Sequence, residues 1–249
     1  MKKLMRYRII SGRTTEVRDV LMEVGGGRRP RGHKSGKSSA KQLERNQTEA
    51  VRVLARQLNC NCKGGDLFLT LKYADDRLPG TAEEAERLVN NFIRRLARLY
   101  KKLTGEKLVY FWTTGRISTK TGLPCRLHHH VVLPAMDWEI IAKHWPPDQF
   151  SYRRLDATGD YTGIARYMIR NAGYGGRKAW RHSTGIKQPV FTTPIPVNRA
   201  GAVKIPPEVR VVERELREDS ESGFHGSYTR WVAPLMTNAQ RHGRRKRNE

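Results

Sequence analysis

Residues 126–134 read RLHHHVVLP, and this pattern predicts a β-strand. Alternate side chains of a strand share a face, so His128 and His130 face one side while His129 faces the other. The apolar residues 131–133 would bury the strand in a sheet. Two imidazoles about 7 Å apart along one strand can converge on a single divalent cation. A histidine-rich surface strand is the alternative, so the choice depends on what the rest of the chain places around this strand.

The charge of the chain points to its class of partner. The 249 residues carry a formal net charge of +24, which favours a polyanion, with nucleic acid first. A zinc hydrolase acting on small molecules would not explain this charge, whereas basic packing proteins would. No window reaches the length of an apolar spanning helix, so we expect no membrane partner. The three cysteines form no C-x-x-C pair, which fits a reducing cytoplasm better than a disulfide framework.

Hydrophobic periodicity predicts alternating helices and strands through the middle of the chain. Strands are expected over 66–73, 108–114, 126–134, 150–155 and 228–232, and helices over 41–58, 81–104, 137–145 and from 160 onward. The two strands over 108–134 are joined closely enough to pair antiparallel, and residues 187–212 favour extended, edge-like structure. The expected domains are a basic flexible arm (1–40), one domain (41–233) and a basic tail (234–249).

The last predicted helix places a tyrosine beside a cation. Tyr161 shares the core face of that helix, whereas Tyr167 lies at the edge of the face with Arg170 nearby, so Tyr167 can point into a cleft. A tyrosine oxygen can attack phosphorus and form a covalent intermediate. A divalent cation stabilises the charge that develops on the phosphate, and a nearby cation favours the phenolate. Together with the histidine strand, these residues indicate phosphodiester transfer.

Four motifs in this order resemble the HUH endonucleases, specifically rolling-circle replication initiators of the phage and plasmid ORF2/gene-II-protein-like type. The motifs are DLFLTLKY (66–73), RLHHHVVLP (126–134), GDYTGIARYMIR (159–170) and RKAWRHSTGIKQPV (177–190). The resemblance covers residues 46–232. It implies an α+β fold with a central antiparallel sheet of about five strands flanked by helices.

The resemblance also implies an activity and its residues. His128 and His130 would hold Mn²⁺ or Mg²⁺, and Tyr167 would nick one DNA strand and keep its 5′-phosphate. Arg170 stands where the family has a lysine. The implied partners are single-stranded or origin hairpin DNA and a host helicase and polymerase, in the cytoplasm of a bacterial host.

Two departures from the family pattern leave alternatives open. The family places an acidic third ligand on the strand before the histidines, but Thr113 and Thr114 stand there. Arg170 keeps the positive charge of the lysine but cannot readily give up a proton. A catalytically weakened DNA-binding protein on this scaffold is therefore one alternative, and a transposase or relaxase using the same chemistry is another.

Six basic residues and one tryptophan near these motifs are the expected DNA contacts. They are Lys72, Arg126, Arg166, Arg177, Lys178, Trp180 and Arg181. Trp180 within its basic segment can stack on a base of a single strand, although an ordinary loop pinned by one buried tryptophan has the same composition.

Overall fold

The computed structural model describes residues 1–25, 39–173, 179–219 and 224–235. The chain forms two compact units. The central unit comprises Ser35–Gln188, and the terminal unit comprises Met1–Lys34 and Pro189–Glu249.

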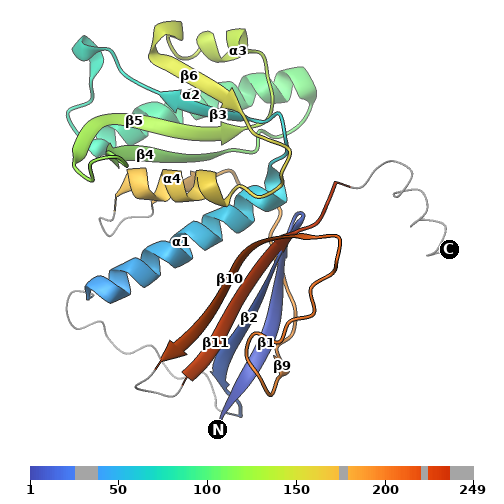
Figure 1. Ribbon diagram of the computed structural model, residues 1–249. Coiled ribbons are helices and arrows are strands. Elements are labelled where there is room, and N and C mark those ends of the chain that lie inside the picture. Colours follow the sequence, from blue (N-terminus) through green and yellow to red (C-terminus); the bar gives the residue numbers. More distant parts are fainter. Residues whose placement is uncertain (26–38, 174–178, 220–223, 236–249) are drawn as a thin grey trace, which may run out of the picture. The chain divides into compact units, whose positions relative to one another are not determined.

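An antiparallel five-stranded sheet forms the middle of the central unit (Figure 1). Its strand order is β6-β3-β5-β4-β7, so the histidine strand lies at the centre. The strands are β3 (Leu67–Leu71), β4 (Phe111–Ile117), β5 (Pro124–Leu133), β6 (Phe150–Arg154) and β7 (Arg181–His182). Every adjacent pair is antiparallel, including β4 with β5. The predicted five-stranded α+β sheet is confirmed.

Helices cover both faces of this sheet. They are α1 (Ala40–Asn61), α2 (Ala82–Thr104), α3 (Trp138–Ala142) and α4 (Thr162–Ala172), with 3-10 turns at Asp75–Arg77 and Pro147–Gln149. The α2 helix begins where predicted, because the Thr81 side chain accepts a hydrogen bond from the Glu84 amide at 3.2 Å. It ends at Gly105, whose φ of 75° is open to glycine at little cost.

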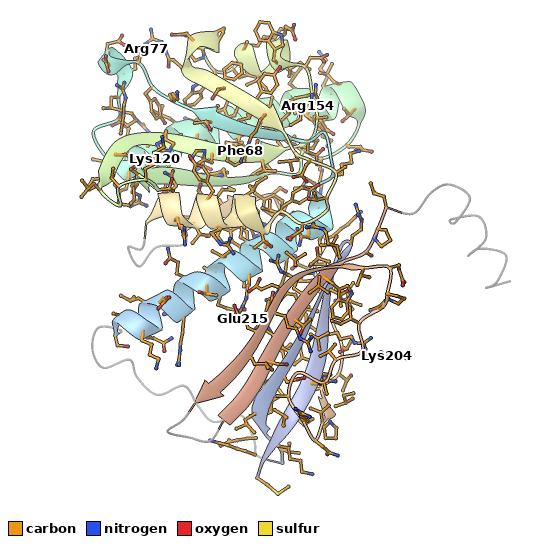
Figure 2. All side chains as sticks on the ribbon, viewed as in Figure 1. Phe68, Arg77, Lys120, Arg154, Lys204 and Glu215 are labelled. Carbon is orange, nitrogen blue, oxygen red and sulfur yellow. The ribbon has the colours of Figure 1, made fainter. Side chains whose placement is uncertain are left out.

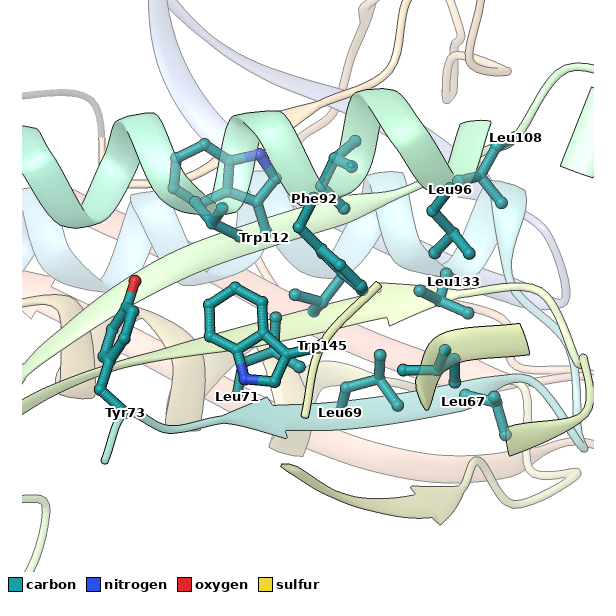
Figure 3. Close-up of a cluster of buried hydrophobic side chains, with 14 residues drawn as sticks. Leu67, Leu69, Leu71, Tyr73, Phe92, Leu96, Leu108, Trp112, Leu133 and Trp145 are labelled. Carbon is teal, nitrogen blue, oxygen red and sulfur yellow. The ribbon is translucent and has the colours of Figure 1, made fainter. Parts of the chain in front are cut away.

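Two apolar clusters lie on the opposite faces of the sheet, and side chains fill both sides (Figure 2). Phe92 of α2 packs with Trp112, Trp145 and the leucines of β3 in the first cluster (Figure 3). The second cluster holds α1 and α4 against Phe68, Phe111 and Val132. The alternation of β5 therefore sends Val131 to the α2 face and Val132 to the α4 face, and His128 and His130 share the face of Val132.

The terminal unit is a second antiparallel sheet. Its path is β10-β11-β2-β1-β8, with β9 also paired to β1. The strands are β1 (Lys2–Ser11), β2 (Thr14–Glu23), β8 (Val190–Phe191), β9 (Ile195–Pro196), β10 (Arg210–Asp219) and β11 (Phe224–Val232). The extended edge segments expected over 187–212 are present as β8 and β9.

The prediction of a flexible arm is wrong for residues 2–23, because these residues form the β1–β2 hairpin. Its interior is partly charged: the Asp19 carboxylate is fully buried and accepts hydrogen bonds from Arg6, Ser227 and the Gly201 amide. A polar interior weakens the apolar alternation by which a strand is recognised. The remainder of the predicted arm, 26–38, and the predicted tail from 236 lie outside the described residues. Two units also replace the single domain expected over 41–233.

Candidate active site

His128 and His130 point their Nε2 atoms at each other. The two nitrogens are 3.2 Å apart, on the sheet face that carries α4. The His128 Nδ1–H donates to the Arg126 carbonyl at 2.8 Å, since a carbonyl can only accept. His130 Nδ1 is 3.2 Å from the Thr70 hydroxyl on the neighbouring strand. Hydrogen bonds at both Nδ1 atoms therefore orient two imidazole nitrogens toward one point, as in metal sites.

Burial keeps His130 uncharged. It lowers the pKa of His130 to about 3, and the nearby His128 and Arg153 act in the same direction, while a hydrogen bond to Asn171 opposes them. Metal binding requires the neutral imidazole. His130 is therefore in its ligand form at any ordinary pH.

His129 lies on the opposite face of β5 and cannot share an ion with its neighbours. Its side chain is fully buried, with Nε2 2.6 Å from the Tyr73 hydroxyl and Nδ1 3.1 Å from the Thr114 hydroxyl. Both ring nitrogens are thus engaged in the interior. The middle histidine is a structural residue that links β5 to the ends of β3 and β4.

Tyr167 lies beside the histidine pair. Its ring centroid is 4.8 Å from that of His130 at an interplanar angle of 60°, and 6.1 Å from that of Phe68. The side chain is 37% exposed, so its ring is held while solvent and a ligand can still reach it. Tyr161, by contrast, is buried in the second cluster, as its helical position predicted.

A pocket of about 420 Å³ opens next to Tyr167. Its lining consists of Phe68, Thr70, Ser151, Tyr152, Arg153 and Tyr167. The Arg153 guanidinium lies 4.9 Å from the centroid of the Phe68 ring. The pocket thus combines aromatic faces, hydroxyls and one cation, which are groups that bind a nucleotide.

Arg153 is the residue that sequence reasoning missed. The alternating segment 150–155 predicted a strand, but not that one of its two adjacent arginines faces the tyrosine. Arg170, which was predicted to assist Tyr167, is exposed on α4 and does not line the pocket.

Asn171 of α4 lies beside the histidine pair. It is 3% exposed, and its Oδ1 is 3.0 Å from His130 Nε2. A Cβ on Gly115, the β4 residue opposite His128, would lie 2.0 Å from that oxygen and 2.4 Å from His128 Nε2. Within the described residues, no group of three or more His, Cys, Asp or Glu side chains could hold a metal.

The predicted DNA contacts do not gather at the pocket. Lys72 and Arg166 are exposed. Arg126 pairs with Asp75 and donates to the Tyr73 carbonyl, and Arg181 lies 3.6 Å from Glu86. Arg177 and Lys178 lie outside the described residues.

Trp180 is half-buried and packs against the second cluster, with its ring 6.3 Å from Phe111 and 5.2 Å from His182. These contacts favour the second interpretation of this segment, an ordinary loop that its tryptophan holds in place.

The described helices include none that is both long and apolar enough to cross a membrane.

Comparison with known proteins shows that residues 66–173 match the family model of the replication-associated proteins ORF2 and gene II protein. No curated protein and no solved structure matches the chain. The matched segment runs from β3 to the end of α4 and contains every residue of the site described above.

Proposed function

We propose that this chain is a replication-associated protein of the ORF2/gene-II-protein type, a rolling-circle initiator that nicks and rejoins single-stranded DNA, and the match of residues 66–173 to that family model supports the proposal. One observation carries the proposal: the Tyr167 ring contacts an imidazole whose Nε2 is 3.2 Å from a second imidazole nitrogen. A nucleophile that attacks phosphorus needs a charge-stabilising group beside it. Tyr167 would be the nucleophile, and a cation held by His128 and His130 would stabilise the charge.

The imidazole pair fits a divalent cation, because both Nε2 atoms face one point and His130 remains neutral. His128 and His130 would hold Mn²⁺ or Mg²⁺, which would supply charge stabilisation to the phosphate. Two nitrogen donors suit several divalent ions, and a phosphate substrate favours these two.

Tyr167 performs the covalent step. Its oxygen attacks phosphorus and loses its proton to solvent through the exposed edge of the ring. A Tyr–O–P bond forms, the P–O3′ bond breaks, and the leaving 3′ oxygen takes up a proton. The protein keeps the 5′-phosphate, and a free 3′-OH remains. Attack by a 3′-OH on the same phosphorus reverses the step and rejoins the strand.

Arg153 binds the phosphate in this scheme. Its guanidinium can donate to the non-bridging oxygens and stays charged throughout. The charge of +24 on the whole chain attracts the DNA backbone without reading its sequence.

The proposed activity also implies host partners and a location in the cell. A 3′-OH primes a host polymerase, and a host helicase would open the duplex ahead of it. This activity belongs in the cytoplasm of a bacterial host, where phage or plasmid DNA replicates.

The test is a covalent trapping assay. A pool of single-stranded oligonucleotides labelled at the 3′ end is incubated with the full chain and MnCl₂, and label that stays with the protein in denaturing gels is counted. We expect an adduct with the native protein and with Tyr152→Phe, the matched control from the same pocket, but none with Tyr167→Phe. Adduct in Tyr167→Phe at the native level would refute the nucleophile.

A second candidate is a DNA-binding protein that has lost the chemistry. It is favoured by the lack of a three-residue cluster of His, Cys, Asp or Glu metal ligands among the described residues. This protein would bind single-stranded DNA and give no adduct with any metal, and His128→Ala would not change its affinity for DNA.

A further inference from the structure

We propose that Asn171 is the third metal ligand of this site, with its side-chain carbonyl in place of a carboxylate. The inference rests on the proposed cation at His128 and His130 and names the group that completes its protein ligands. It assigns to α4 a second role besides carrying Tyr167.

The distances fit one ion. Asn171 Oδ1 and His128 Nε2 are 3.0 and 3.2 Å from His130 Nε2. Ligands at right angles on an octahedral ion, each about 2.1 Å away, lie about 3.0 Å from each other. Both distances from His130 Nε2 therefore match the spacing of neighbouring ligands on one Mn²⁺ or Mg²⁺.

The orientation of the amide is fixed. The Asn171 NH₂ group donates to the Ile117 carbonyl at 2.7 Å, a bond that the amide oxygen could not make. The oxygen is therefore turned toward the histidines. Since the side chain is buried, it has little freedom to leave this position.

Gly115 leaves space for the Asn171 side chain and the His128 ring. Any side chain at this β4 position would overlap both Asn171 Oδ1 and His128 Nε2. At this position β4 therefore has no side chain that could serve as a ligand, and the Asn171 amide from α4 occupies the space.

Calorimetric titration of the metal-free full chain with MnCl₂ tests this assignment. We expect Asn171→Leu to weaken Mn²⁺ binding at least about tenfold, as loss of a metal-orienting group does. Asn171→Asp should tighten it, because a carboxylate adds charge at the same position. The control is Asn59→Leu, which removes another buried asparagine, on α1, that accepts from the Tyr161 amide. It should leave the affinity unchanged.

The outcomes separate the two proposals. If His128→Ala leaves Mn²⁺ binding unchanged, the metal site of the proposed function fails. If His128→Ala abolishes binding while Asn171→Leu binds as the native protein does, only the role of Asn171 is overturned. Should Asn171→Leu not fold, Asn171→Asp decides the matter, since equal or weaker affinity in that variant contradicts a ligand at this position.

Discussion

Tyr167 and Asn171 lie on the same helix, and the ring of one and the amide of the other both contact His130. Residues four apart on a helix point the same way, so α4 presents a phenol and an amide carbonyl to the same imidazole. The histidine strand and α4 thus form the site together. The following predictions test the parts of this arrangement separately.

Arg153→Leu should weaken binding of single-stranded DNA and lower the rate of adduct formation. The loss of one phosphate contact should also reduce the slope of log affinity against log salt by about 0.7. Fluorescence anisotropy with a labelled oligonucleotide at several salt concentrations measures both effects.

The matched control is Arg154→Leu, since Arg154 is the next residue of β6 and donates to the Gly65 carbonyl. An equal change of slope in both variants would show that Arg153 has no special place in the pocket.

His129→Ala should destabilise the central unit by about 3 kcal/mol, because it leaves a cavity and two hydroxyls without their buried partner. Mn²⁺ affinity, measured well below the unfolding temperature, should persist. Chemical denaturation and calorimetry make the comparison. Loss of metal binding in a folded His129→Ala protein would argue against the division of the three histidines described here.

Gly115→Ala should lower Mn²⁺ affinity at least about tenfold, because the added methyl group displaces the ligand atoms of Asn171 and His128. Gly163→Ala on α4 is the control, since its Cβ would meet no atom within 4 Å. Titration calorimetry of both variants provides the measurement, and equal affinities would contradict the crowding at Gly115.

The terminal unit should lose stability in acid through Asp19. Burial opposes ionisation of this carboxyl, but hydrogen bonds from Arg6, Ser227 and Gly201 and the charge of Arg6 lower its pKa below the usual value. The unfolded chain therefore takes up the proton first as the pH falls. The stabilisation is present above about pH 4 and disappears as the pH drops through the folded pKa.

Asp19→Asn should remove this dependence and cost about 3 kcal/mol at pH 7, since the largely buried Arg6 loses its partner. Scanning calorimetry from pH 3 to 7 tests the point. A native protein and variant with parallel pH profiles would exclude Asp19 as the acid-sensitive group.

The sequence predicted the central unit well because its signals there are local. The alternation of β5, the cap at Thr81 and the apolar stripe of α2 each depend on neighbours in sequence. The α4 helix was expected from residue 160 onward, and it begins at Thr162, with the Asp160 carboxylate accepting from the Thr162 amide. Such features need no knowledge of the tertiary fold.

Three features could not be predicted because they depend on contacts between distant segments. The hairpin β1–β2 buries Asp19, which accepts hydrogen bonds from Ser227 of β11 and the Gly201 amide as well as from Arg6. Arg153 and Arg154 are indistinguishable until the side of β6 that faces α4 is known. Nothing in the sequence around Asn171 shows that α4 packs beside Gly115, which brings the Asn171 side-chain oxygen next to the histidines.

The α4 helix fixes the distance between Tyr167 and Asn171. Four residues of helix advance about 6 Å, and this fixed length separates Tyr167 from Asn171. No loop intervenes, so in the proposed mechanism the span between the attacked phosphorus and the cation would be set by the helix backbone itself. A single residue inserted between them would turn one of the two by about 100° and disconnect the attacking group from its electrostatic support, while the helix remained intact.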